Sequence, residues 1–183
     1  MLRIIGGTWR GRRLRFPPQP GIRPTPDRVR ETLFNWLAPR VPGGRCLDLF
    51  AGSGALGLEA LSRGAAQVTF IERDAVAARE LRARLAEWGA SGAQVEHNDA
   101  LRFLAGTPVQ TYDIVFLDPP FSSGLLADSA RVLEERQWLA RDARIYVETS
   151  GSAGLPPLPH TWRLIKTKEA GAVGYHLMAK GEG

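Results

Sequence analysis

The sequence predicts an α/β fold in which a mostly parallel, doubly wound β-sheet carries helices on both faces. Between residues 45 and 148, short apolar runs alternate with amphipathic stretches, which is the pattern of strand–helix–strand units. Residues 114–117 form an uninterrupted apolar run, typical of a strand that is buried on both faces. With 183 residues, 44% of them hydrophobic, the chain can bury a substantial core without disulfides.

The expected elements follow one another without internal repeats. Residues 2–5 and 13–16 are two short alternating runs around a glycine-rich turn and predict a β-hairpin, after which Pro17, Pro18, Pro20 and Gly21 break regular structure. Thr25, interpreted as a cap, and Pro26 precede an amphipathic stretch that predicts a helix over residues 27–37. We then expect strands at 45–50, 67–72, 94–97, 112–118 and 144–148, helices at 55–63, 74–88, 100–104 and 128–139, and a closing antiparallel hairpin of 162–168 and 173–178.

The positive charge of the chain is concentrated at its beginning. Residues 1–30 hold eight arginines and one acid, Asp27, and so carry +7, whereas the whole chain carries +5. Guanidinium groups suit bidentate phosphate contacts, and a local basic patch is typical of nucleic-acid binders. A solvated basic surface without a partner is the alternative. We expect two parts: a basic hairpin extension with its linker, residues 1–22, and a main domain, residues 23–183.

The composition also excludes several classes of protein. Cys46 is the only cysteine, so no disulfide can form within the chain and no Cys/His cluster has zinc-ligand spacing. We interpret it as a buried structural thiol. No apolar run approaches the roughly 20 residues that cross a bilayer, and the N-terminus lacks the apolar region of a signal peptide. The expectation is a cytoplasmic protein without a membrane partner.

A glycine-rich loop follows the strand expected at 45–50. Gly52, Gly54 and Gly57 match G-x-G-x-x-G, and Glu72 ends the next strand, where a carboxylate can accept both hydroxyls of a ribose. A nicotinamide dinucleotide is one ligand that fits this pattern. Asp48, directly before the loop, would repel a pyrophosphate and attract a cationic sulfonium–amino-acid ligand. A glycine turn that serves packing alone is the third interpretation.

The strand at 94–97 ends in His97-Asn98-Asp99. Asp99 could accept a hydrogen bond from the adenine amino group of a cofactor, with Ala100 supplying a backbone contact. It could equally be an ordinary helix N-cap. We interpret His97 as structural, because no second ligand or base partner accompanies it.

Asp118-Pro119-Pro120-Phe121 follows the apolar run at 114–117. The prolines hold the loop extended and stiff, and we expect its carbonyls to lack competing local donors. The Asp118 carboxylate and the Pro119 carbonyl can then accept hydrogen bonds from an aromatic amine, turning its lone pair towards a methyl donor. Phe121 offers a face on which an extruded base can stack. The four residues predict methylation of an exocyclic amine on a nucleic-acid base, and a turn without a chemical role is the alternative.

Five stretches resemble the RsmD family of 16S ribosomal RNA guanine-N2 methyltransferases. They are RIIGGTWRGR at 3–12, RPTPDRVRETLFN at 23–35, DLFAGSG at 48–54, IERD at 71–74 and DPPF at 118–121. The first two are specific to the family, whereas the glycine loop and Asp-Pro-Pro-Phe occur in many amino-methyltransferases. The resemblance implies a Rossmann-like class I methyltransferase fold, with a seven-stranded sheet, a terminal antiparallel hairpin and a small N-terminal hairpin extension.

The resemblance further implies S-adenosylmethionine as the cofactor, released as S-adenosylhomocysteine, with no metal. Asp118, Pro119, Pro120 and Phe121 are the expected catalytic residues. The expected cofactor-binding residues lie in the Arg-Pro-Thr segment, the glycine loop and the ends of the following strands: Arg23, Thr25, Arg28, Asp48, Phe50, Ala51, Gly52, Ser53, Gly54, Glu72, Arg73, Asp99 and Ala100.

The basic hairpin fits contact with RNA by charge and by stacking. The expected RNA-binding residues are Arg3, Trp9, Arg10, Arg12 and Arg13. The implied substrate is the 16S RNA of a small ribosomal subunit or of its assembly intermediate, with ribosomal proteins as further partners. Two alternatives stay open: an adenine-N6 methyltransferase of DNA or RNA, and a non-catalytic RNA-binding assembly factor. The short chain leaves no room for a separate target-recognition domain, which disfavours sequence-specific reading of DNA.

Overall fold

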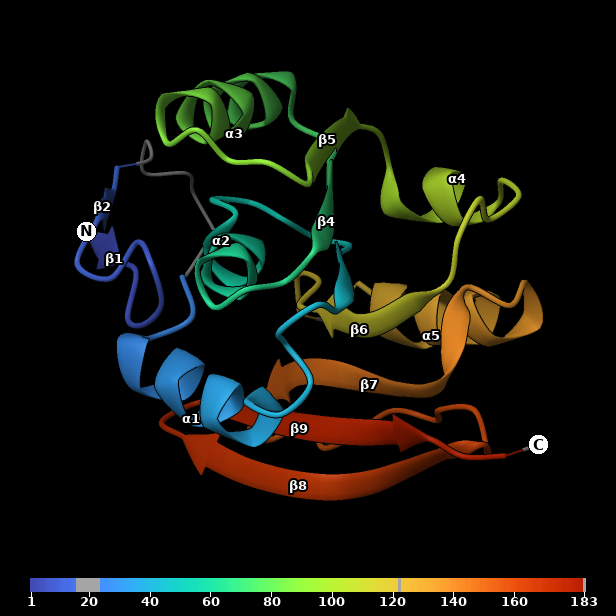
Figure 1. Ribbon diagram of the computed structural model, residues 1–183. Coiled ribbons are helices and arrows are strands. Elements are labelled where there is room, and N and C mark those ends of the chain that lie inside the picture. Colours follow the sequence, from blue (N-terminus) through green and yellow to red (C-terminus); the bar gives the residue numbers. More distant parts are fainter. Residues whose placement is uncertain (16–23, 122, 183) are drawn as a thin grey trace.

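The computed structural model describes residues 1–15, 24–121 and 123–182. Its main sheet has seven strands in the order β5-β4-β3-β6-β7-β9-β8 (Figure 1). Five strands are parallel to one another: β3 (Arg45–Asp48), β4 (Gln67–Glu72), β5 (Ala93–His97), β6 (Tyr112–Leu117) and β7 (Leu139–Ser150). The last two, β8 (Trp162–Ala170) and β9 (Val173–Lys180), form an antiparallel hairpin, and β9 also pairs antiparallel with β7.

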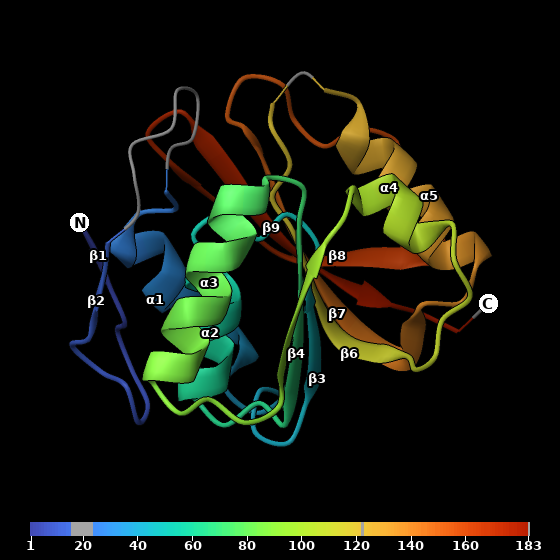
Figure 2. The same cartoon turned by 90° about the horizontal axis from the view of Figure 1, so that it is seen from above.

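Helices cover both faces of this sheet, as Figure 2 shows. On one face lie α1 (Asp27–Leu37), α2 (Ala55–Ser62) and α3 (Ala75–Glu87), which share a hydrophobic core with alternate residues of the strands, such as Cys46 and Phe116. On the other face lie α4 (Ala100–Leu104) and α5 (Leu125–Glu135), which pack on the intervening residues, such as Leu47 and Val115. The class I methyltransferase fold that the resemblance implied is thus confirmed.

A second, two-stranded sheet is formed by β1 (Leu2–Arg3) and β2 (Arg13–Leu14), with Leu2 paired to Leu14. This N-terminal hairpin lies beside α1 and α2 (Figure 1). The Thr8 amide donates to the carbonyl of Ser62, the last residue of α2, at 2.8 Å. This hydrogen bond fixes the hairpin to α2.

Most expected elements are found within two residues of their sequence limits, and those at 27–37, 67–72 and 100–104 agree at both ends. The prediction of a helix over 128–139 is wrong in its limits, because α5 begins and ends earlier. Gln137 has a φ of 59°, and the Trp138 amide donates to the Leu133 carbonyl, which ends the helix in a Schellman motif. The chain therefore enters β7 at Leu139, five residues before the expected strand.

The expected cap of α1 is also wrong. Pro26 occupies the N-cap position without a side-chain hydrogen bond to the helix, and the hydroxyl of Thr25 donates elsewhere, to Glu148. Residues 16–23 lie outside the described part of the chain, so Phe16, the proline-rich linker and Arg23 remain sequence expectations.

Candidate active site

Four carboxylic acids lie along one edge of the main sheet, at or near the carboxyl ends of four neighbouring strands. In the order of the sheet they are Glu72 on β4, Asp48 on β3, Asp118 after β6 and Glu148 on β7. In doubly wound sheets, ligands bind outside the carboxyl ends of the strands. The row of acids therefore marks the edge at which a ligand is expected.

The strand register places the acids on the same face. Leu117 pairs with Val147, so Asp118 and Glu148, which follow them, are neighbours. Asp48 lies two positions before Asp118 in the register of β3 and β6. Side chains two positions apart point to the same face of a sheet, and this is the face that α1 and α2 cover.

None of the four acids forms an ion pair with another described residue. Glu72 is held instead by backbone amides. The Gly52 amide donates to Oε2 at 2.7 Å, and the Asp74 amide donates to Oε1 at 2.9 Å. Each carboxylate oxygen retains a further lone pair for hydroxyl donors. The edge therefore offers carboxyl groups without ion-pair partners to a cationic or hydroxyl-bearing ligand.

The loop from β3 to α2 uses its glycines differently. Gly52 has a φ of 55°, and a Cβ atom there would meet no atom within 4 Å, so open space adjoins the loop at this point. Gly54 has a φ of 78° and forms the N-cap of α2. At Gly57 a Cβ atom would overlap the ring of Phe70, so close packing of α2 on the sheet requires glycine. The loop can thus approach a ligand without side chains in the way.

Asp48 is buried beneath this loop, with 2% of its surface exposed. The Gly57 amide donates to its Oδ2 at 3.0 Å. Burial raises the pKa of Asp48 to about 7, against the opposing effect of the Gly57 hydrogen bond, and the nearby charge of Glu72 adds to the rise. A positive charge beside Asp48 would favour its ionised form, because an opposite charge lowers the pKa of a carboxyl group.

The turn after β6 combines a buried start with an exposed end. Pro119 is buried, Asp118 is partly exposed, and Pro120 and Phe121 are exposed, Phe121 to 46%. The Ser123 hydroxyl donates to the Pro120 carbonyl at 2.6 Å, so the expectation that the carbonyls of this loop lack local donors is wrong for Pro120. The exposed ring of Phe121 remains free to receive a flat partner.

Glu148 is the residue of this edge that the sequence reasoning missed. It is 5% exposed and accepts hydrogen bonds from the Thr25 hydroxyl and from the Tyr146 phenol, both at 3.1 Å. Its signal in the sequence is its position directly after the apolar residues 145–147, a feature that it shares with Asp118, but no distinctive motif follows it. Desolvation raises the pKa of Asp118 well above its usual range, and the adjacent negative charge of Glu148 adds to it.

Other expected cofactor residues lie around the loop or at its margins. Asp99 caps α4 by accepting the Arg102 amide at 3.0 Å, so one of its two interpretations is observed, and Ala100, the first residue of α4, is buried. Arg73 is exposed, and its carbonyl bonds to the ring of His97 at 3.0 Å. In the glycine loop and α1, the structure buries Ala51, half-buries Phe50 and Ser53, and exposes Arg28 on the first turn of α1.

The hairpin residues expected to bind RNA are exposed in four cases of five, namely Arg3, Arg10, Arg12 and Arg13. Trp9 is half-buried, and its ring packs at 5.2 Å on the ring of Trp88, which follows α3. The guanidinium groups of Arg12 and Arg84 lie over Trp88, at 5.3 and 5.9 Å. Part of the Trp9 ring surface that stacking would use is therefore covered by the protein itself.

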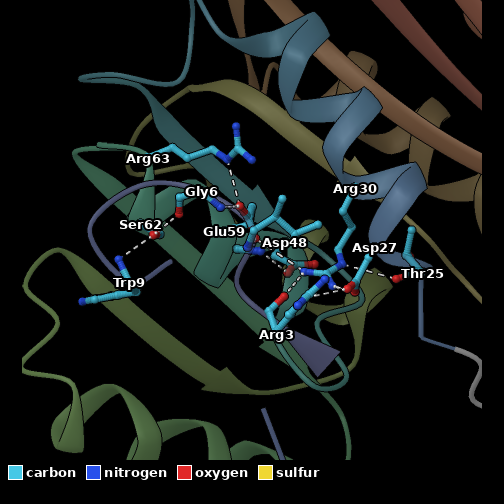
Figure 3. A network of polar contacts seen from close by, with 12 residues as sticks. Arg3, Gly6, Trp9, Thr25, Asp27, Arg30, Asp48, Glu59, Ser62 and Arg63 are labelled. Carbon is cyan, nitrogen blue, oxygen red and sulfur yellow. Dashed lines mark hydrogen bonds and ion pairs between the residues drawn. The ribbon is translucent and has the colours of Figure 1, made fainter. Parts of the chain in front are cut away.

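A buried polar network holds the hairpin to α1 and α2 (Figure 3). Glu59 accepts the amides of Ile5 and Gly6, at 3.0 and 2.8 Å, and forms ion pairs with Arg30 and Arg63. Arg30 and Glu59 are fully buried. Of the arginines at the start of the chain, Arg30 is therefore internal and contributes no surface charge.

The described ranges, 1–15, 24–121 and 123–182, contain no group of three or more His, Cys, Asp or Glu side chains arranged to hold a metal ion. Within the same ranges, every helix is too short or too polar to span a membrane. Cys46 is buried as expected, and burial raises its pKa to about 12.

The fold and this edge together define a class of protein. A glycine-rich loop follows the first parallel strand, an acid ends the second, and Asp-Pro-Pro-Phe follows the fourth, on a seven-stranded sheet that closes with an antiparallel hairpin. This is the arrangement of a class I methyltransferase.

Comparison with known proteins narrows the class. Residues 2–179 match the family described as Conserved hypothetical protein 95. The Ribosomal RNA small subunit methyltransferase D of Escherichia coli (strain K12) is 54% identical over 99% of this chain and 92% of its own length. The chain therefore belongs to this family, which confirms the resemblance to RsmD proteins.

Solved structures agree with this assignment. A putative methyltransferase from Escherichia coli superimposes with a TM-score of 0.90 at 51% identity, covering 98% of both chains. An RNA methyltransferase from Salinibacter ruber, in complex with S-adenosyl-L-homocysteine, has a TM-score of 0.64 at 18% identity, covering 87% of this chain and 95% of that chain. The second similarity concerns the fold alone.

Proposed function

We propose that this protein transfers a methyl group from S-adenosylmethionine to the N2 amine of a guanine in the 16S RNA of the small ribosomal subunit. The observation that carries the proposal is the position of Asp118 beside Asp48, at the ends of the adjacent parallel strands β6 and β3. An amine-binding acid and a loop suited to a cationic ligand thus meet at one edge. The relatives named as ribosomal RNA methyltransferases support the substrate class, and such a substrate implies the cytoplasm.

The residues at this edge fit S-adenosylmethionine. The loop adjoins open space at Gly52, the oxygens of Glu72 can accept ribose hydroxyls, and Asp48 favours a positive charge in the ligand. We assign the ribose to Glu72 and the methionine part to the loop from Asp48 to Gly54. When bound, the cofactor supplies an electrophilic methyl group on a sulfonium. The other expected residues of the cofactor site, including Arg23, Arg28, Arg73, Asp99 and Ala100, belong to this proposal.

The acceptor amine is bound by the turn after β6. The Asp118 carboxyl group and the Pro119 carbonyl accept hydrogen bonds from the amine, which draws its nitrogen out of conjugation with the ring. Orientation of this kind supplies much of the catalysis when reacting atoms are held close to contact distance. Phe121, exposed at the end of the turn, stacks on the base, and stacking of an unpaired base on an aromatic ring is common in RNA recognition.

The N-terminal hairpin contributes contacts to the RNA outside the reacting base. Arg3, Arg10, Arg12 and Arg13 are exposed on it, and Arg15, also exposed, follows β2. Phosphate contacts of this kind give affinity and fix orientation without reading sequence. We propose that residues 1–22 act as an RNA-binding extension of the domain formed by residues 23–183, on a subunit or an assembly intermediate with its ribosomal proteins.

The test is transfer of tritiated methyl groups from S-adenosylmethionine onto small subunits from a strain that lacks the enzyme, followed by nucleoside analysis. We expect N2-methylguanosine as the product. Asp118→Ala should abolish transfer, while calorimetry shows that the variant still binds the cofactor. N6-methyladenosine as the only product, or full activity of Asp118→Ala, would contradict the proposal.

A further inference from the structure

Glu148 connects three separate segments of the chain next to Asp118. Its Oε2 accepts the Thr25 hydroxyl from the segment before α1 and the Tyr146 phenol from β7, each at 3.1 Å. Its carboxyl group also lies beside that of Asp118, because Leu117 and Val147, the residues that precede the two acids, pair in β6 and β7. Because only 5% of its surface is exposed, Glu148 would act on a bound base through its neighbour Asp118.

Thr25, which donates a hydrogen bond to Glu148, is itself held by its neighbours. Thr25 is 5% exposed, and the Nε atom of Arg30 donates to its carbonyl at 3.3 Å. The same guanidinium donates to the Arg3 carbonyl at 3.0 Å and pairs with Glu59, so it is bound from several sides, as Figure 3 shows. The hydroxyl of Thr25 therefore reaches Glu148 from a buried residue whose own carbonyl is hydrogen-bonded to Arg30.

Such an arrangement matters for Asp118 because of the torsional freedom of aspartate. The χ2 torsion of an aspartate has broad preferences, so the backbone alone does not set the orientation of the carboxyl plane. Hydrogen bonds to an amine are directional and weaken steeply as they bend. A neighbour that holds one carboxyl oxygen determines where the other points.

We propose that Glu148 is a positioning residue for the reaction: fixed by Thr25 and Tyr146, it orients the Asp118 carboxyl group that receives the acceptor amine. The inference rests on the proposed function of this site. It assigns to Thr25, from the Arg-Pro-Thr segment, a role on the side of the acceptor rather than direct contact with the cofactor.

The closeness of Asp118 and Glu148 also affects how the two carboxyl groups ionise. Two adjacent carboxyl groups cannot both ionise easily, so they share a proton and titrate as a unit. Desolvation raises the pKa of Asp118 well above its usual range, and the negative charge of Glu148 adds to the rise. The ionisable groups facing the pair are Asp48 of β3, Tyr146 of β7 and Tyr175, which pairs with Glu148 from β9.

Steady-state methyl transfer onto small subunits tests the inference. Glu148→Ala should lower kcat on the order of a hundredfold, the scale of a small misplacement of a reacting group. The KM for subunits and the calorimetric Kd for S-adenosylmethionine should change little. Thr25→Val should lower kcat in the same way, whereas Thr25→Ser, which keeps the hydroxyl, should restore it. Glu135→Gln, which removes one exposed carboxylate on α5, is the matched control and should leave kcat unchanged.

Glu148→Gln provides a measurement that loss of folding cannot imitate. The amide keeps an oxygen for Thr25 and Tyr146 but removes the charge beside Asp118, so the acidic limb of kcat/KM should move to lower pH. Carbon-13 carboxyl shifts of Asp118, followed through a pH titration without subunits, should show the same downward move in the pKa.

The outcomes separate the two proposals. Unchanged kcat in Glu148→Ala, or an Asp118 titration that is the same in wild type and Glu148→Gln, would overturn the inference about Glu148. A wild-type enzyme that transfers no methyl group to subunits would overturn the proposed function instead, and the carboxyl titration would still decide whether the two acids form a pair.

Discussion

Asp48 combines, in one residue, nearly complete burial with an ionisable group. Its pKa of about 7 in the folded chain lies above the ordinary value of 3.8. A carboxyl group whose pKa is raised by folding adds stability below the ordinary value, and that stability is lost as the pH rises through the folded value. At neutral pH and above, ionisation of the buried Asp48 therefore lowers the free energy of unfolding of the ligand-free protein.

Asp48→Asn should remove that cost, because asparagine keeps an acceptor for the Gly57 amide and cannot ionise. The free energy of unfolding at pH 8 should rise by about 1–4 kcal/mol, within the limit of 1.36 kcal/mol for each unit of pKa. The difference in free energy of unfolding between the variant and the wild type should shrink as the pH falls below 7 and vanish near pH 4. Urea denaturation at several pH values measures it, and a difference that does not vary with pH would contradict the explanation.

Asp118 and Glu148 differ in how easily they can be identified as site residues from the sequence. Asp118 could be identified because two prolines and a phenylalanine make its surroundings distinctive. Glu148 follows an equally apolar run, but its neighbours Thr149 and Ser150 are unremarkable in sequence. Its importance depends on Thr25, which lies 123 positions away in the chain, and no local pattern reports that contact.

The position of the N-terminal hairpin depends on contacts between secondary-structure elements. Its strands have two residues each, too few to be stable alone, so its position depends on contacts with α1 and α2. Glu59 supplies them by accepting two hairpin amides and pairing with Arg30. The sequence predicted the hairpin from its glycine turn, but Arg30 looked like one more surface arginine, because burial of its partner Glu59 is a tertiary property.

Glu59→Gln should destabilise the protein by about 3 kcal/mol, since breaking a buried ion pair leaves a charge without compensation. Amide hydrogen exchange at Ile5 and Gly6 should accelerate together with this destabilisation, because both amides donate to Glu59. The comparison is Glu135→Gln, which breaks an exposed pair with Arg131 and should cost less than about 1 kcal/mol. Equal effects of the two variants would show that the buried network does not hold the hairpin.

On the scale of the whole molecule, the exposed arginines of the hairpin and the acidic edge of the sheet have opposite charge. This separation suits a protein that binds RNA phosphates with one part and a cationic ligand and an amine with another. It also predicts that affinity for subunits depends on salt, because each phosphate contact releases bound counterions.

The double variant Arg12→Ala, Arg13→Ala should raise the KM for subunits. It should also reduce the slope of log affinity against log salt by about 0.7–0.9 for each phosphate that the variant no longer neutralises. Its Kd for S-adenosylmethionine should stay at the wild-type value. Arg131→Ala, on α5 and the opposite face of the sheet, is the control that also removes an exposed arginine. An unchanged salt dependence in the double variant would place the RNA-binding surface elsewhere.

The sequence by itself determined the fold class, the order of the parallel units, the glycine loop and Asp-Pro-Pro-Phe, because periodicity and turn chemistry are local properties. The tertiary structure decided which side chains meet. It turned the Thr25 hydroxyl from the start of α1 to Glu148, buried Arg30 with Glu59 and covered part of Trp9 with Trp88. These contacts join residues that are distant in the chain, and their energies depend on burial, which only the folded arrangement defines.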